Sequence, residues 1–511
     1  MVESSGTRTA RPGAWTNPRP KAVASLNDFG GTRLSRRLAS WRGDGTSINT
    51  YLAAGGDDLR ARARQMCRDN PYAANAKEGF IAAAVGTGIK PSSLIADAER
   101  KKAIQAAFLA WTDEADADGL TDFYGLQALA AGASFEAGEC FIRLRPRRAE
   151  DGLTVPLQLQ VLESELLPLT DNRTAPNGNV IRCGIEFNGI GKRVAYHFLK
   201  RHPGENIVGA SSFERTVVPA ADVLHLYRPM RPGQVRGQPA ITPGMVRLYL
   251  LDQYDDAELD RKRVAAMFAG FITKPTAESE NPLSGADDFA TPDGVAAEQV
   301  VVADDAVIAP MEPGGLQVLL PGEDIEFSSP TEVGGSYEAF QFRQLCAISA
   351  GLGIPYHIVS GDLSKANYGS QRGGQVEFRR RVDQYQHAVL VFQLCRPVWL
   401  RWLEAAVLSG AVPITPAEFA RNRAALSAAK WIPPRWEWID PKKDREAQAL
   451  AEDRGWTARS DSIEAEGYDP EEVDARIAAD RSREQRLGLT FPKVDPAPAP
   501  QLPPDEQGFP A

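Results

Sequence analysis

The chain has 511 residues, of which 43% are hydrophobic and 24% charged, and its formal net charge is −9. This length predicts about two to four domains or one large assembly unit, and the composition excludes a fibre and a wholly disordered chain. An acidic chain lacks the basic surface that holds nucleic acid by its phosphates, so a DNA partner is expected to pass along it rather than stay bound.

The first half of the chain predicts an arm followed by an α+β unit. Residues 1–50 are rich in Gly, Ser, Pro and Arg, which predicts a partly disordered arm. Over 51–240 the apolar period changes from helical to strand-like. Helices are expected at 57–69, 72–85, 97–114 and 123–137, and strands at 139–145, 157–162, 182–187, 194–199 and 223–227. Asn70-Pro71 should separate the first two helices, and 188–192 predicts a hairpin turn.

The second half reads as more helical, so the fold class is a helix-rich α+β. We expect a long helix over 241–272, a small β-rich insertion over 273–333, a helix over 334–352 and a loop over 353–374. A second long helix should run from 375 to 410, bent or locally broken at Pro397, within a segment that reaches 440. Charged, alanine-rich residues 441–490 predict exposed helices, and 491–511 predict a disordered Pro-rich tail.

Motifs for nucleotide, metal or acyl chemistry are missing from the sequence. No G-x-x-x-x-G-K-[ST], H-E-x-x-H or G-x-S-x-G stretch occurs, and the five histidines are dispersed. The cysteines have no C-x-x-C spacing, which is typical of idle thiols in a reducing compartment; they are Cys67, Cys140, Cys183, Cys346 and Cys395. No apolar leader and no window of about 18 apolar residues is present. We therefore expect a soluble protein made in a cytoplasm, with no catalytic residue, cofactor, metal or membrane partner.

Several short stretches, each weak alone, occur in one order over residues 60–490. They are 68–73 (RDNPYA), 85–89 (VGTGI), 138–141 (GECF), 157–163 (LQLQVLE), 194–197 (VAYH), 220–225 (AADVLH), 228–237 (RPMRPGQVRG), 350–355 (AGLGIP), 367–370 (NYGS), 395–399 (CRPVW) and 438–442 (WIDPK). Together they resemble the lambda-like family of tailed-bacteriophage portal proteins, the head–tail connectors. Gly369 is a departure, since the family pattern has serine there.

The resemblance implies a portal fold laid out in a fixed order along the chain. It implies a wing over 51–240, stem helices at 241–272 and 334–352 on either side of a clip-like insertion at 273–333, a tunnel loop at 353–374, a spine helix and wing return at 375–440, and a helical crown at 441–490. Family members form closed rings of about twelve copies by head-to-tail contacts.

The resemblance also implies a non-enzymatic function. The ring would form a DNA channel at one capsid vertex and serve genome packaging, motor docking, head–tail joining and DNA ejection. Its expected partners are double-stranded DNA without sequence specificity, the large terminase subunit, the major capsid protein, and head-completion or tail connector proteins. The protein would assemble in the host cytoplasm and reside in the virion. The alternatives are another structural head protein, such as a capsid or head-completion subunit, or a packaging enzyme, which the missing motifs disfavour.

Three aspartates on the first long helix are the first candidate site. Asp252, Asp256 and Asp260 follow one another at i, i+4 and i+8, so they lie near one another along one side of a helix. They form either a solvated face or an acidic stripe on a channel wall that repels phosphates. The basic run 261–263 that follows could pair with a neighbouring subunit's acids or be solvated, and the sequence does not decide between these.

The second candidate site is the polar loop between the two long helices. Its residues could touch DNA phosphates transiently and without sequence preference, although an ordinary connection between helices is the alternative; they are Asp362, Ser364, Lys365, Asn367, Tyr368, Gln371 and Arg372. Five late tryptophans favour core packing around the second long helix over base stacking; they are Trp399, Trp402, Trp431, Trp436 and Trp438.

Overall fold

The computed structural model describes residues 44–205, 214–266, 270–273, 301–303, 306–308, 324–327, 337–364, 368–436 and 440–490. Nearly all of the predicted arm, most of the predicted clip-like insertion and the Pro-rich tail therefore lie outside the described residues. Of the insertion, the structure gives two short antiparallel pairs: β10 (Gly270–Thr273) with β13 (Asp324–Phe327), and β11 (Val301–Ala303) with β12 (Ala306–Ile308).

Four helices form the N-terminal part of the body: α1 (Ile48–Asp69), α2 (Pro71–Ala84), α3 (Ala98–Thr112) and α4 (Phe123–Ala137). Asn70 separates the first two helices as predicted. Its side-chain oxygen accepts hydrogen bonds from the backbone N–H groups of Tyr72 and Ala73, and Pro71 stands at the first helical position. α1 begins nine residues earlier than expected, because Ser47 caps it and the Gly55-Gly56 pair does not interrupt it.

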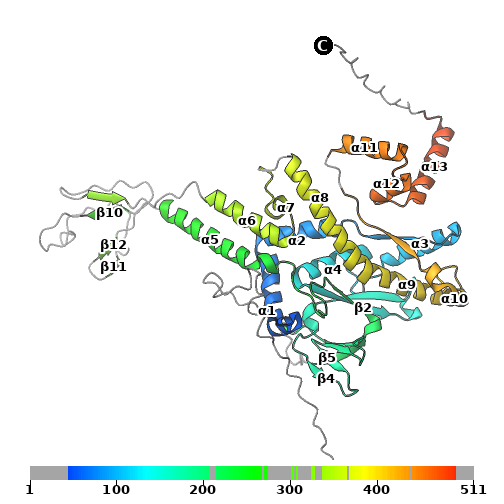
Figure 1. Ribbon diagram of the computed structural model, residues 1–511, viewed down its shortest axis with the longest axis horizontal. Helices are drawn as coiled ribbons and strands as arrows, with labels where there is room; N and C mark the ends of the chain where they lie inside the picture. Colours follow the sequence, from blue (N-terminus) through cyan, green and yellow to red (C-terminus); the bar gives the residue numbers. More distant parts are fainter. Residues whose placement is uncertain are drawn as a thin grey trace, which may run out of the picture.

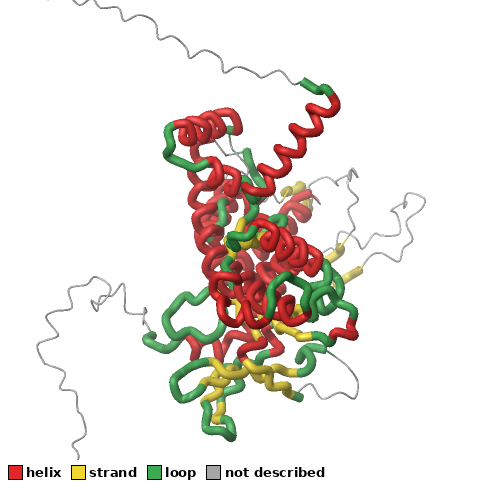
Figure 2. The backbone as a smooth tube through the Cα atoms, turned by 90° about the vertical axis from the view of Figure 1, so that its right-hand side faces the viewer, coloured by secondary structure: helices red, strands yellow, loops and turns green. Residues whose placement is uncertain are grey.

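The strands form two small antiparallel sheets beside these helices. One has the order β3 (Leu157–Leu162), β2 (Glu139–Pro146), β9 (Val223–Tyr227). The other has the order β4 (Arg173–Thr174), β5 (Val180–Arg182), β6 (Ile185–Phe187), β7 (Arg193–Leu199), β8 (Arg215–Pro219). The predicted hairpin joins β6 to β7. A further pair joins β1 (Lys90–Ser93) to β14 (Ala429–Ile432). Figure 2 shows most strands gathered at one end of the body, with the helices stacked beyond them.

The second half of the chain carries two helical assemblies. The antiparallel pair α5 (Thr242–Ala266) and α6 (Tyr337–Leu352) lies side by side and extends away from the body (Figure 1). After α7 (Tyr356–Ser360), a long helical run consists of α8 (Tyr368–Tyr385), a π-helical stretch (Gln386–Cys395) and α9 (Arg396–Ser409). The remaining helices are α10 (Pro416–Leu426), α11 (Pro441–Asp453), α12 (Arg459–Ala465) and α13 (Pro470–Leu487), the last three forming a group at the far end.

The long helical run is continuous where the sequence predicted a bend at Pro397. The irregularity precedes the proline and takes the form of ten π-helical residues. Proline has no N–H to donate to the carbonyl four residues before it, and its ring crowds that carbonyl. A wider turn ahead of Pro397 relieves this conflict without breaking the helix.

Aromatic side chains of α3, α4 and α9 fill the main core. Trp399 and Trp402 are buried, and the Trp402 ring centroid lies 4.9 Å from that of Phe108. Trp431 and Trp436 are partly buried against the same core, whereas Trp438 lies outside the described residues. The interpretation of the described tryptophans as core residues is confirmed, since burial of such rings is a dominant source of stability.

Candidate functional site: the stem pair and the segment after α6

The three aspartates predicted as a stripe all lie exposed on α5. Asp252 accepts a hydrogen bond from the Asn70 side-chain nitrogen at 3.3 Å, at the junction with the body. Asp260 pairs with Arg263 at 3.2 Å, whereas Asp256 has no ion pair among the described residues. The geometry therefore places the carboxylates on one side of the helix, with Asp256 as the member whose charge is not compensated by a described cation.

The basic run after the stripe pairs within its own helix. Arg261 contacts Glu258 at 2.7 Å and Lys262 contacts the same carboxylate at 3.9 Å. The hydrogen bond from Arg261 lowers the pKa of Glu258. Intrahelical pairs at these spacings contribute only a few tenths of a kcal/mol, about 0.2–0.5 each. Within the described chain Arg261 and Lys262 pair inside their own helix, and pairing with a neighbouring subunit's acids stays a prediction.

The inner side of α5 is bonded to α6. Asp255 accepts hydrogen bonds from the Tyr337 hydroxyl at 2.9 Å and the Gln341 amide at 3.3 Å. Burial, together with the Asp255 carboxylate, raises the pKa of Tyr337 to about 12. Nearer the body, Arg247 donates to Gln344 at 2.9 Å. These contacts hold the two helices together as one pair. They therefore determine which faces of α5 and α6 remain exposed to solvent.

The predicted tunnel loop is not one continuous loop. Residues 356–360 form α7, and residues 368–374 form the first two turns of α8, so the irregular parts that are described are 353–355 and 361–364. The glycines at 369, 373 and 374 suggested a loop because glycine is a poor helix former. These glycines nevertheless lie in the first turns of α8, with open space around Gly373 and Gly374.

The predicted loop residues consequently have different surroundings. Asp362 organises the turn: it accepts a hydrogen bond from the Tyr356 hydroxyl at 3.0 Å and from the Ser364 backbone N–H at 2.8 Å. Ser364 is exposed, and Lys365 and Asn367 lie outside the described residues. Three members belong to α8 instead: Tyr368, whose side chain is not described, the half-buried Gln371, and the exposed Arg372, which pairs with Asp444 of α11 at 3.3 Å.

A buried charged network at the root of the stem was not predicted. Arg236, in the segment leading into α5, is 0% exposed and pairs with Glu139 of β2 at 2.6 Å. It also donates to the backbone carbonyls of Leu167 and Cys183 at 2.8 and 2.7 Å. Glu139 in turn accepts from Ser164 at 2.6 Å. The network ties the wing sheet to the start of the stem.

His225 of β9 completes this network, its Nε2 lying 2.9 Å from a Glu139 oxygen. Burial lowers the pKa of His225 to about 4, outweighing the carboxylate that favours its charged form. Burial alone would raise the pKa of Glu139, but Arg236 and the His225 hydrogen bond hold it well below its usual value. At neutral pH, His225 is therefore a neutral donor to an ionised Glu139.

Stability should fall as the pH drops from about 6.5 to 4. The folded pKa of His225 lies below its ordinary value, so the unfolded state binds more protons in this window and acid favours unfolding. The full effect is about 3 kcal/mol, reached near pH 4. Thermal melts from pH 7 to pH 4.5 should show the loss, and His225→Gln should flatten it. An equal flattening by His387→Gln, at an exposed position, would contradict the assignment.

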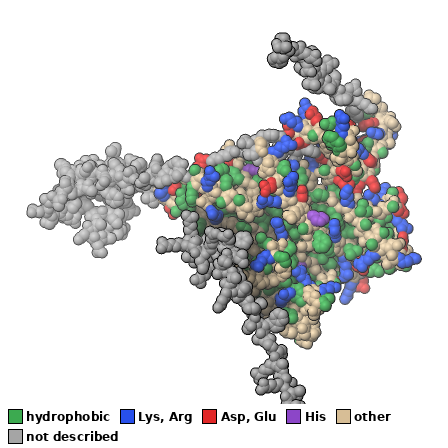
Figure 3. Space-filling view, viewed as in Figure 1, with side chains coloured by type: hydrophobic (Ala, Val, Ile, Leu, Met, Phe, Trp, Pro, Cys, Tyr) green, Lys and Arg blue, Asp and Glu red, His purple; other side chains and the backbone are tan. Residues whose placement is uncertain are grey.

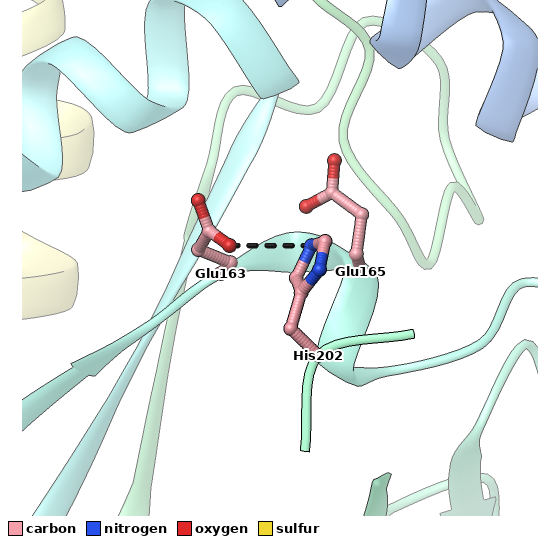
Figure 4. Close-up of side chains that lie close together, drawn as sticks. All are labelled: Glu163, Glu165 and His202. Carbon is pink, nitrogen blue, oxygen red and sulfur yellow. Dashed lines mark ion pairs between the residues drawn. The ribbon is translucent and has the colours of Figure 1, made fainter. Parts of the chain in front are cut away.

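Three potential metal ligands come together elsewhere in the wing. Figure 4 shows Glu163, Glu165 and His202, with the His202 ring nitrogen 3.3 Å from a Glu163 oxygen. Arg64 of α1 donates to Glu163 at 2.7 Å and to Glu165 at 2.8 Å. Because a guanidinium already compensates both carboxylates, this group is a salt-bridge cluster between α1 and the segment after β3.

Comparison with known proteins identifies the family to which this chain belongs. A profile described as "Phage portal protein, lambda family" matches residues 34–386, more than half of the chain. The chain belongs to the lambda family of phage portal proteins. Over 490 residues it is 26% identical to a probable portal protein of Halomonas phage phiHAP-1, covering 93% of this chain and 90% of that protein. It is 23% identical over 520 residues to portal protein B of Escherichia phage lambda, covering 93% of each.

Among solved structures, this portal-family chain resembles the neck of a native gene transfer agent particle, computed with twelvefold symmetry. The TM-score is 0.46 at 14% identity, covering 85% of this chain and 98% of that one. Among the described helices, none has the length and apolar character needed to cross a membrane. The face in Figure 3 intermixes acidic, basic and apolar groups over the body, with no extended basic patch.

Proposed function

We propose that copies of this chain assemble into a ring, about twelve subunits around, that encloses a channel for double-stranded DNA at one capsid vertex. In this arrangement the α5–α6 pair is the stem, the segment between them is the clip-like part where the terminase motor docks, and α11–α13 form the crown. Membership of the portal family supports the ring. The observation that carries the channel is the exposed carboxylate row of α5 on a helix pair that stands away from the body.

The acidic row suits a channel through which DNA moves better than a site that holds DNA in place. Each phosphate contact made by a basic wall would add affinity and slow DNA movement, whereas carboxylates repel the backbone. Repetition around a ring multiplies the effect of each single carboxylate. The chain acts in this proposal as a structural channel without catalysis or cofactor, in the virion, with capsid and head–tail connector proteins as further partners.

Rings in electron micrographs of the purified full chain are the first test, together with their mass in solution. Persistent monomers under assembly conditions would count against the proposal. ATPase and nuclease assays on the same material should show no activity, since an enzyme of the packaging machinery would give one.

Replacing one channel carboxylate with a cation tests the acidic row. Asp256→Lys removes no described ion pair, and in the rings that form, packaging in a reconstituted particle should slow because every subunit adds a phosphate-binding group. Glu150→Lys, at an exposed position of the wing, is the matched charge control and should leave the rate unchanged. Equal rates for both variants would remove the acidic row from the channel wall.

A further inference from the structure

The stem pair exposes two more faces that differ in shape. On α5, Val246 and Leu250 are 66% and 59% exposed, one turn apart, and the exposed Ala257 continues their line. We call these three residues the apolar face. On α6, the exposed small residues Ala339, Ala347 and Ala350 share one side with Arg343, and we call these four residues the small face; the ring of Phe340, 43% exposed, borders it on the side of α5. Large branched residues on one helix and small ones on the other are complementary.

The direction of each face follows from helix geometry and the contacts already given. α5 turns about 100° per residue, which puts the apolar face roughly a quarter turn from α6 and another quarter turn from Asp252, Asp256 and Asp260. On α6, the small face lies away from α5, and the side opposite it, with Leu345 and Ser349, is buried in the body. Each helix of the pair thus has one outer face that nothing in the described chain covers.

We propose that the apolar face of α5 packs on the small face of α6 in the next copy of the chain, an inference that rests on the proposed ring. A closed ring needs two different, complementary faces on each subunit, and the stem pair supplies both. Helices would then alternate α5, α6, α5, α6 around the ring in a zigzag of two layers. In this arrangement the acidic row stays exposed on the side of the α5 layer that no helix covers. The α6 layer lies on the other side, against the body.

The heights of the two faces along the stem also agree. Within one chain, Arg247 bonds Gln344, and a side chain placed on Gly351 would meet Pro243. These contacts put Val246 level with Ala347, and Leu250 level with Arg343. Rotation about a ring axis parallel to the stem changes no height, so the same residues face one another between neighbours. Val246 would then meet Ala347, and Leu250 would lie on the aliphatic part of Arg343.

Charge agrees with this arrangement as well. Arg343 makes no ion pair with any described residue, although it is exposed in the middle of the small face. Its side chain tilts toward the N-terminal end of α6, as side chains on helices do. Asp256 and Asp260 border the apolar face toward that same end of the stem. A neighbour's Arg343 therefore meets acidic groups at the edge of the contact rather than other cations.

Disulfide trapping tests the contact directly. In full-length chain carrying Cys346→Ala, the pair Val246→Cys and Ala347→Cys should give, on oxidation, a ladder of covalent oligomers on a non-reducing gel. Each single substitution should give no ladder, because the two faces differ. Val217→Cys with Ala347→Cys is the matched control, since Val217 of β8 is 56% exposed on the wing. Rings in micrographs without a ladder would overturn the contact while leaving the ring in place.

A charge placed in the apolar face gives a second readout. Leu250→Lys should shift the protein from ring to monomer in size-exclusion chromatography with an unchanged circular dichroism spectrum, whereas Val217→Lys should keep the ring. A Leu250→Lys ring of normal size would overturn the contact. If the unsubstituted chain formed no ring at all, the proposed function itself would be contradicted. The experiment therefore distinguishes a wrong contact from a wrong function.

Discussion

Arg236→Ala is expected to destabilise the protein by about 3–5 kcal/mol, because it removes the cation closest to Glu139 and leaves this interior carboxylate with Arg60, 3.9 Å away, as its one remaining charged partner among the described residues. Both side chains are essentially without solvent contact, at 0% and 1% exposed. The substitution also removes the donors to the carbonyls of Leu167 and Cys183. The remaining donors to Glu139 are His225, Ser164 and the Gly237 backbone, and the buried Arg60 at 3.9 Å is itself paired with Asp57, so these groups compensate the charge only in part.

Matched variants separate charge from packing in this network. Arg231→Ala changes an exposed arginine of the same segment and should stay within about 0.5 kcal/mol of the original chain. Removing both charges together, by Glu139→Leu with Arg236→Met, should restore part of the loss, since the penalty comes from the unpaired ion. Denaturant midpoints measure all three. An Arg236→Ala chain as stable as the Arg231→Ala chain would show that the buried pair contributes nothing.

The loss of Arg236 should affect ring assembly as well as the stability of each subunit. Arg236 lies in the segment between β9 and α5, so its bonds fix how the stem leaves the wing. A ring closes only when every subunit holds the same angle between these parts. We therefore expect that Arg236→Ala chains which still fold will form fewer closed rings and more open arcs in micrographs.

Local patterns in the sequence were sufficient for most of the fold. The Asn70-Pro71 break, the hairpin at 188–192 and the two stem helices follow from capping, turn chemistry and apolar periodicity, and the described structure contains each of them. Some element boundaries were read incorrectly. The helix expected over 241–272 ends at Ala266, with β10 over 270–273, and the strand expected over 182–187 is two strands, β5 and β6. The start of α8 was taken as loop because glycine is a poor helix former, and the irregularity expected at Pro397 lies just before it as a π-helical stretch.

The buried network could not be predicted because its members are far apart in the chain. Glu139 and Arg236 are separated by 97 positions, and both lie in stretches that carried the family resemblance. One signal was available: Glu139 stands directly before the apolar run Cys140–Ile142 of the strand, and a charge at such a position requires a buried partner. The identity of that partner depends on the antiparallel pairing of β2 with β9, which no local pattern specifies.

Deletion of Leu363–Ser370 is expected to abolish packaging or retention of DNA while leaving ring assembly largely intact. Most of the described part of this segment is open to solvent: Leu363 is 58% exposed, and Ser364 and Gly369 are exposed too. None of these residues belongs to a buried core cluster. The segment runs from the turn after α7 into the first turn of α8, and in the proposed ring every subunit would present one copy of it toward the DNA.

A replacement of equal length distinguishes the side chains from the spacing. Exchange of the eight residues for Gly and Ser keeps the distance between α7 and α8, so it should assemble rings as well as the original chain does. If side-chain contacts with phosphates matter, this chain should also lose DNA, whereas if only the bulk of the segment matters, packaging should recover. Packaged DNA per particle, measured by nuclease protection, reports both. Normal packaging by the outright deletion would show that the segment has no part in gripping DNA, and Arg372, which pairs with Asp444 of the crown, would then be a structural tether only.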